Sequence, residues 1–401
     1  MQLEPKTASA PNRTGISRDN SASVGALKEK LQRVVASGLY HSGLLRMARR
    51  IEGTHELISI GGSRLPRLRR TPVSKFGVLC YHRVGTEGVP LFSRLEPAVF
   101  EAQMQYLKRN YRIVPLGQLC RELREGNQVT PTLAITFDDG YRDLYTYAFP
   151  VLEKYVIPAT IYLIGRCMET GEAPWYDRIF VALAHAPATT IDLEMGALRQ
   201  FMLSTPASRA AAAWEIVCYL RSIPDLQRQR WCSLFEQRIS PPVRQLEGRM
   251  LNWEHVRAMQ RGGILFAAHT MTHPSVSRLG PAAFHEEFVA AKRILEDGLD
   301  APVEDFAYPF GRPADVSSEA RDFLARSGYR SAVTTIEGFN SPGRDPYMLN
   351  RLQIGDDQSM AGFACGVTRL FMEAPADSYS RYGTPLQDQG NARMAARRSD
   401  L

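Results

Sequence analysis

The stretch Thr136-Phe137-Asp138-Asp139-Gly140 decides the fold, and it closes the apolar run Leu133 to Phe137, which is typical of a buried strand. Neighbouring side chains point apart on a strand, but where the chain turns two adjacent carboxylates can converge on one site. Because adjacent acids repel, a cation or a raised pKa usually stabilises such a pair. Taken alone, Asp-Asp-Gly is more often a loop in which one aspartate caps the next helix.

A second stretch, His269-Thr270-Met271-Thr272-His273-Pro274, changes that interpretation. It also follows an apolar run, Ile264 to Ala268. Two imidazoles four residues apart, together with one carboxylate, make a three-ligand set of the kind that holds catalytic zinc. Each half follows a predicted strand, so the pattern predicts a metal site that only the fold can assemble.

Length and composition indicate one large globular domain with appendages. The 401 residues suffice for a barrel-sized core. No apolar run reaches the roughly 18 residues of a membrane helix, and the polar first thirty residues contain no secretory h-region. The six cysteines lack Cys-x-x-Cys spacing and are expected to be buried free thiols. These features favour a cytoplasmic protein.

The positive charge belongs to the N-terminal segment. Residues 1–76 hold 14 Lys and Arg against 5 Asp and Glu, a net of 14 − 5 = +9, which leaves 7 − 9 = −2 for the rest. This distribution argues against a nucleic-acid-binding domain. A predicted helix between Val24 and Ile51 carries much of the charge. It can pack on the core with a solvated basic face, or it can contact an anionic membrane surface, which would place the protein at the inner membrane face.

The remaining pattern predicts alternating strands and helices. We expect a disordered segment over 1–23, a basic helical segment and linker over 24–76, a main domain over 77–360 and a tail over 361–401. Within the main domain, residues 171–250 are rich in helix formers and are expected to form a helical insertion. Strand–helix alternation on both sides of the insertion is typical of an α/β fold with a parallel sheet or barrel.

These motifs resemble those of a known family, the polysaccharide deacetylases with the NodB homology domain, carbohydrate esterase family 4. The resemblance runs from about Val78 to Ile354 and includes a third motif, Ala307-Tyr308-Pro309-Phe310-Gly311. It implies a distorted (β/α) barrel with its site at the C-terminal ends of the strands, which is where the motifs fall in the predicted pattern.

The resemblance also implies roles for individual residues. Asp139, His269 and His273 would bind the metal, with water completing the shell, and Asp138 would be the general base that deprotonates this water. Zinc is the expected metal, although such sites also accept cobalt, iron or nickel. The candidate substrate contacts are Tyr308, Pro309, Phe310 and, at the start of the insertion, Trp175. Trp175 can stack on a sugar ring or anchor the insertion by core packing.

Two departures from the family pattern concern the catalytic machinery. Ala307 stands where the family usually has an arginine that contacts the base, and Arg142 or Arg351 could replace it from elsewhere in the chain. The late histidine that usually serves as general acid is missing. His82, at the end of the first predicted strand of the main domain, is our candidate proton donor; the alternative is a structural histidine at the barrel rim.

The predicted function is therefore a metal-dependent hydrolase that removes N-acetyl groups from an amino-sugar polysaccharide or from a lipid-linked sugar intermediate. The Tyr81-His82 strand and the Tyr-Pro-aromatic-Gly form resemble the subgroup that builds extracellular polysaccharide. Two alternatives remain at this point. One is a catalytically silent carbohydrate-binding protein on the same fold, and the other is a deacylase of a small amide or a formylated lipid sugar.

Overall fold

The computed structural model describes residues 75–86, 94–126, 131–239, 241, 243–356 and 359–372. The disordered segment predicted over 1–23 and nearly all of the basic segment over 24–76 lie outside these residues. None of the described helices combines the length and the apolar content that a membrane span requires.

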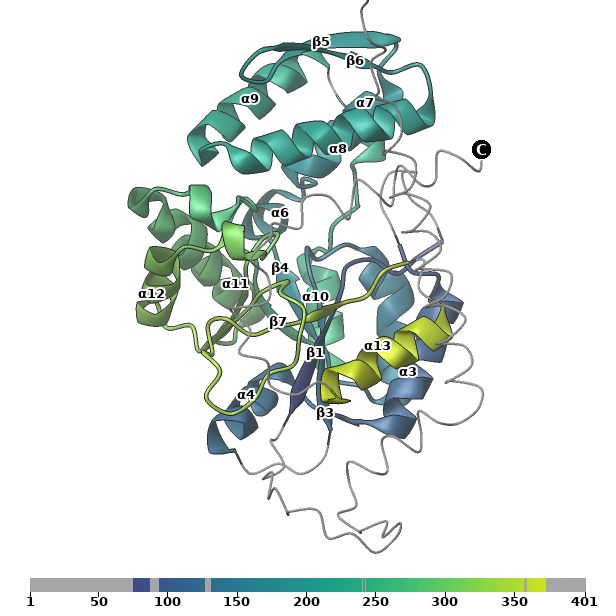
Figure 1. The fold of residues 1–401 in the computed structure, drawn as a ribbon, viewed down its shortest axis with the longest axis vertical. Helices are drawn as coiled ribbons and strands as arrows, with labels where there is room; N and C mark the ends of the chain where they lie inside the picture. Colours follow the sequence, from purple (N-terminus) through teal and green to yellow (C-terminus); the bar gives the residue numbers. More distant parts are fainter. Residues whose placement is uncertain are drawn as a thin grey trace, which may run out of the picture.

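A parallel sheet curled into a barrel forms the body of the protein, as the sequence predicted (Figure 1). Its strands follow the order β10-β1-β3-β4-β7-β8-β9, and β2 pairs with β3 beside this path. The strands are β1 Phe76–Tyr81, β2 Arg112–Ile113, β3 Thr132–Phe137, β4 Thr160–Leu163, β7 Leu265–Ala268, β8 Asp305–Ala307, β9 Ser331–Val333 and β10 Leu352–Gln353. All the strand pairs on this path are parallel, so their carboxyl ends meet at one rim.

The segment 349–353 connects the two edges of the sheet. Leu349 forms a parallel bridge with Val333 of β9, and its carbonyl accepts a 2.8 Å bond from the Thr334 amide. Three residues later Leu352 pairs with Leu79 of β1. One short stretch of chain thus closes the barrel and leaves neither edge unpaired there.

Side chains alternate between the barrel interior and the surrounding helices, as the period of a strand requires. On β1, Val78 faces an interior cluster with Ala134, Tyr162 and Ala307, whereas Leu79 faces the layer that the helices cover. The covering elements are α3 Pro97–Asn110, η1 Leu144–Ala148, α5 Phe149–Tyr155, α6 Gly165–Thr170, α10 Trp253–Arg261, η5 His285–Ala290, α11 Ala291–Leu299 and α12 Ser318–Arg326.

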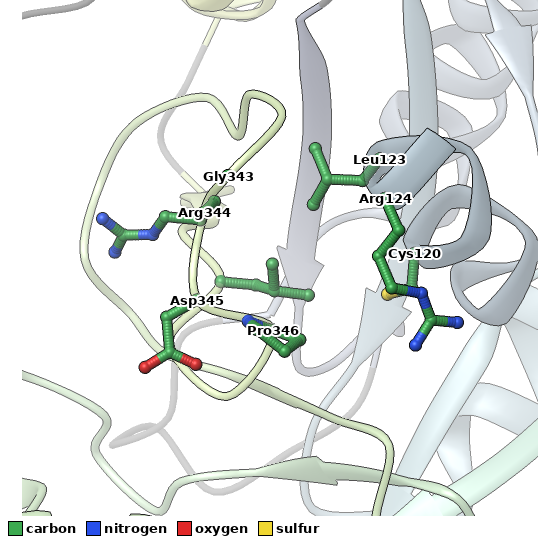
Figure 2. A pocket seen from close by; sticks show the side chains of 8 residues that line it. Cys120, Leu123, Arg124, Gly343, Arg344, Asp345 and Pro346 are labelled. Carbon is green, nitrogen blue, oxygen red and sulfur yellow. The ribbon is translucent and has the colours of Figure 1, made fainter. Parts of the chain in front are cut away.

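Helix α4 (Leu116–Glu125) plugs the end of the barrel where the strands begin. Leu119 and Leu123 pack into the interior cluster, and Cys120 lies near Asp305 and Ser331, which open β8 and β9. A pocket of about 360 Å³ lies between α4 and the loop around Arg344 and Asp345 (Figure 2). None of the predicted site residues lines it.

The insertion predicted over 171–250 forms a separate lobe above the carboxyl rim, but it is not purely helical (Figure 1). Helices α7 Trp175–His185, α8 Pro206–Ser222 and α9 Asp225–Arg238 pack around their own core together with an antiparallel hairpin, β5 Thr190–Glu194 and β6 Leu198–Met202. The sequence prediction missed this hairpin because five-residue strands between helices leave only a short alternating pattern.

The C-terminal boundary predicted at residue 360 falls at the start of a helix. Helix α13 (Met360–Met372) lies beside α3 and contributes Phe363, Val367 and Phe371 to the main core (Figure 1). The deacetylase-like domain therefore extends to at least residue 372. The remaining short helical turns are η2 Val243–Gln245, η3 Val276–Arg278, η4 Pro281–Ala283 and η6 Pro313–Asp315.

Candidate active site

The carboxyl ends of β3 and β7 bring Asp139, His269 and His273 together. One oxygen of Asp139 lies 3.6 Å from Nε2 of His269 and 3.4 Å from Nε2 of His273. All three side chains are buried, and their candidate ligand atoms lie within 4.8 Å of one another. The predicted cluster therefore exists in the fold, although 130 residues separate its first two members.

Left-handed backbone conformations aim these side chains. Asp139 has φ 73°, His273 has φ 58° and Phe310 of the third motif has φ 60°. Residues other than glycine adopt such angles at a cost of order 1–3 kcal/mol each, so the surrounding structure has to hold them. Strain of this kind often concentrates at functional sites, and here all three residues lie at the same rim of the barrel.

The electrostatic environment fits a cation. Burial, reinforced by the neighbouring Asp138 charge, raises the pKa of Asp139 to about 8, so this carboxylate needs a positive partner to ionise fully at neutral pH. Burial lowers the pKa of His269 to about 4 and holds that of His273 well below its usual range. Both imidazoles are thus neutral, which is the form that binds metals.

A backbone carbonyl orients the ring of His269. Its Nδ1 lies 2.7 Å from the carbonyl oxygen of Ala307, and because a carbonyl can only accept, Nδ1 carries the proton. Nε2 is then left with its lone pair directed toward Asp139 and His273. Metal-binding histidines are usually fixed in this way, by a hydrogen bond from the ring nitrogen that does not bind the metal.

Asp138 is held by Arg351. The guanidinium donates two bonds of 2.7 Å to the two carboxylate oxygens, and it is itself fully buried. Burial alone would raise the pKa of Asp138, but the arginine outweighs it and holds this pKa well below its usual range. Asp138 and Asp139 therefore have opposite environments: an arginine holds the pKa of Asp138 down, whereas burial and the Asp138 charge raise the pKa of Asp139.

Arg351 accounts for the missing arginine of the third motif. It comes from the segment that closes the barrel, and its guanidinium lies 5.8 Å from the Tyr162 ring of the interior cluster to which Ala307 also belongs. Nε of Arg351 donates to the Thr334 carbonyl at 2.7 Å. The other sequence candidate, Arg142, is exposed.

His82 lies beside Asp138 at the end of β1. Its Nε2 is 3.9 Å from Oδ2 of Asp138, and the side chain is 42% exposed. Partial desolvation lowers the pKa of this imidazole. The Asp138 charge opposes this effect and the Arg351 charge adds to it, so the neutral form dominates at pH 7. The position combines access to solvent with proximity to the acid pair.

The predicted substrate contacts differ in accessibility. Tyr308 is fully buried against Phe306, and Pro309 is also buried, so Phe310 is the member of this motif whose side chain is partly exposed. The Phe310 ring packs edge-on against His273 at 5.0 Å. Trp175 is 8% exposed, with the guanidinium of Arg228 over its ring at 5.0 Å.

Comparison with known proteins settles the family. The polysaccharide deacetylase family matches residues 125–332, slightly more than half of the chain. The protein belongs to this family. It is accordingly a deacetylase-type hydrolase of the α/β class.

Individual relatives are distant. The chain is similar to a protein of Bacillus subtilis strain 168 named for polysaccharide deacetylation, YxkH, with 22% identity over 74% of this chain and 77% of that protein. It is 31% identical to the poly-β-1,6-N-acetyl-D-glucosamine N-deacetylase of Escherichia coli K12 over 25% of this chain and 15% of that protein. A solved structure, the Streptococcus pyogenes deacetylase PplD with acetate, has a TM-score of 0.51 at 20% identity, covering 74% of this chain and 99% of that chain.

Proposed function

We propose that this deacetylase is metal-dependent and removes N-acetyl groups from an amino-sugar polysaccharide. The observation that carries the proposal is the buried trio Asp139, His269 and His273 beside a separately neutralised Asp138. A carboxylate and two neutral imidazoles are a donor set that suits zinc, and cobalt, iron and nickel also fit it. A lipid-linked sugar intermediate is the alternative acceptor.

The residues would divide the work by their environments. A divalent cation held by the trio would lower the pKa of water toward 7 and polarise the acyl oxygen. Asp138 would accept the proton of the attacking water. Because its pairing with Arg351 makes Asp138 a weaker base, the contribution of this ion pair is positional: it fixes the carboxylate in its ionised form and in one orientation.

His82 would donate a proton to the leaving amine. It is the described histidine nearest to Asp138 outside the metal-binding trio, and its partly exposed ring can exchange protons with solvent. Phe310 would border the bound sugar, with Tyr308 and Pro309 shaping the turn that presents it. Trp175 is 8% exposed and packs under Arg228 and beside Phe310, so it would anchor the insertion instead of stacking on the sugar.

The test is acetate release from oligomers of N-acetylglucosamine with β-1,4 and β-1,6 linkages. The second linkage is chosen because a relative is named for it. Native, chelated and metal-restored protein would be compared with Asp138→Asn and with the exposed control Asp297→Asn. We expect release that stops on chelation, returns with zinc or cobalt, is lost in Asp138→Asn and persists in the control.

Two results would contradict the proposal. Release that is unaffected by complete metal removal would exclude the metal-dependent mechanism. Stoichiometric metal binding without release from any N-acetylated sugar, including lipid-linked ones, would indicate a binding protein or a deacylase of another amide.

A further inference from the structure

The last turn of α8 carries an arginine that connects the insertion to the rim of the barrel. Nε of Arg221 donates to Oδ1 of Asp315 at 2.8 Å, and Nη2 donates to Oδ2 of the same carboxylate. Asp315 is 2% exposed and also accepts from the Ser275 hydroxyl at 2.8 Å and from the Arg312 amide at 3.0 Å. One buried carboxylate therefore fastens the insertion to the turn after the third motif and to the segment just beyond His273.

The same guanidinium lies over the ring of Phe310. Its central carbon is 4.8 Å from the ring centre, within the range in which an aromatic face attracts a cation. The Phe310 ring also lies 5.0 Å from the His273 imidazole and 6.4 Å from the Trp175 ring. Because Phe310 has φ 60°, its neighbours have to hold this residue in place. Arg221 is one of the groups that determine where the ring lies.

A second arginine of the insertion shows the contrast between anchoring and positioning. Arg228 donates to the Thr272 hydroxyl at 3.2 Å and lies over Trp175 at 5.0 Å. Arg228 is 3% exposed and Trp175 is 8% exposed, so this attachment is sealed inside the protein. The side chain of Arg221 is 19% exposed, and Phe310 is partly exposed. Arg221 thus holds a ring that a ligand at the rim can reach.

We propose that Arg221 is a positioning residue for substrate binding, which acts by holding Phe310 in the orientation that contacts an amino-sugar oligomer. The insertion then takes part in recognising the sugar through a residue that does not touch the reacting atoms. The inference rests on the proposed function, because it requires an N-acetylated sugar at this rim. It deepens that function by assigning the insertion a role in substrate affinity.

The test is a double-mutant cycle of Arg221→Lys and Phe310→Ala in the full chain. Lysine keeps a positive charge beside the buried Asp315 but lacks the planar fork that pairs with this carboxylate and lies over the ring. Calorimetry on metal-stripped protein measures the dissociation constant of the N-acetylglucosamine pentamer in both linkages. KM and kcat for acetate release are measured in parallel on zinc-loaded protein.

The cycle should show that the two residues act through one contact. Arg221→Lys should weaken pentamer binding and raise KM about tenfold while kcat stays within about twofold, because a lost apolar contact with a substrate is worth roughly 10-fold or more. In the Phe310→Ala background the same substitution should have no further effect, since coupled contacts do not add. Arg221→Met with Asp315→Asn removes both charges together and should repeat the result if the lysine variant does not fold.

An ion pair elsewhere in the insertion provides the matched control. Arg178 of α7 pairs with Glu172 at 2.9 Å and with Glu236, and its side chain is 27% exposed. Arg178→Lys alters a comparable attachment that does not include Phe310. This control should change thermal stability without changing pentamer binding or KM.

The outcomes separate this inference from the proposed function. Additive effects in the cycle, or unchanged pentamer binding and KM in folded Arg221→Lys, would overturn the positioning role, while acetate release by the wild type would still support the proposed function. A loss confined to kcat would also overturn it. Coupled losses of binding in a protein that releases no acetate would support the positioning role and contradict the proposed function. A wild type that neither binds nor deacetylates the pentamer would overturn both.

Discussion

Replacing Arg351 by methionine tests how the acid pair is stabilised. The change removes two 2.7 Å bonds to Asp138 and a 2.7 Å bond to the Thr334 carbonyl, while a side chain of similar length still fills the space. Asp138 is 2% exposed, so water cannot replace the lost partner. Breaking a buried ion pair from one side costs about 3–5 kcal/mol.

The loss should depend on pH in a defined direction. In the wild type the folded pKa of Asp138 is depressed, so its stabilising contribution is present above the unfolded pKa of about 3.9 and is lost only as the pH falls toward the folded value. In the variant, burial without the guanidinium should raise the folded pKa. Stability should then fall as the pH rises above about 4, and the difference between the two proteins should widen toward pH 7.

Urea unfolding between pH 4 and 8 measures this difference. The exposed pair of Arg330 and Glu304 provides the control, and Arg330→Met should cost at most about 1 kcal/mol. A double variant, Arg351→Met with Asp138→Leu, should regain much of the stability while releasing no acetate. Our reasoning is refuted if Arg351→Met unfolds within 1 kcal/mol of the wild type at pH 7.

Three further outcomes follow from the geometry of the rim. Gly140→Ala should cost about 2–4 kcal/mol of stability in thermal unfolding, because φ is 79° and the new Cβ would lie 2.6 Å from the Leu163 side chain. The control Gly171→Ala, at φ 75° with open space around it, should cost only about 1 kcal/mol. Equal losses would show that the contact with Leu163 contributes nothing. His82→Gln should lower kcat and remove the fall in rate that deprotonation of the donor causes as the pH rises, a fall that should begin below the ordinary histidine range because the pKa of His82 is lowered; an unchanged pH profile would exclude His82 as the acid. Asp139→Asn should abolish zinc binding in calorimetry and acetate release with it; retention of stoichiometric zinc would remove Asp139 from the ligand set.

Much of the fold was predictable from local patterns. The strands before Asp138 and His269 are short apolar runs that end in polar motifs, and parallel pairing brings such ends to one rim. The α/β class and the parallel sheet followed from this regularity, whereas the family and its distorted barrel followed from the resemblance of the motifs. The four buried residues of helix α4 recur at helical spacing, a pattern that local sequence shows directly.

The parts that could not be predicted depend on contacts between distant segments. The sequence named Arg351 only together with Arg142, because nothing in the local sequence of Arg351, 213 positions from Asp138, distinguishes it from an ordinary surface arginine. The bond from the Trp175 indole to the His273 carbonyl forms only because the first turn of α7 lies against the His273 loop. The sequence prediction assigned α13 to a tail, because local sequence does not show that its apolar residues cover α3 and β1, which are far away in the chain.

The position of Arg351 has a consequence for the order in which the protein matures. During synthesis the ribosome releases Asp138 long before the segment that both closes the barrel and supplies the guanidinium. Until that segment docks, burying the Asp138 carboxylate without a partner would be unfavourable, so this side chain is stable only in contact with water. The same segment therefore completes both the barrel and the ion pair of Asp138, and a chain interrupted before residue 351 would lack both.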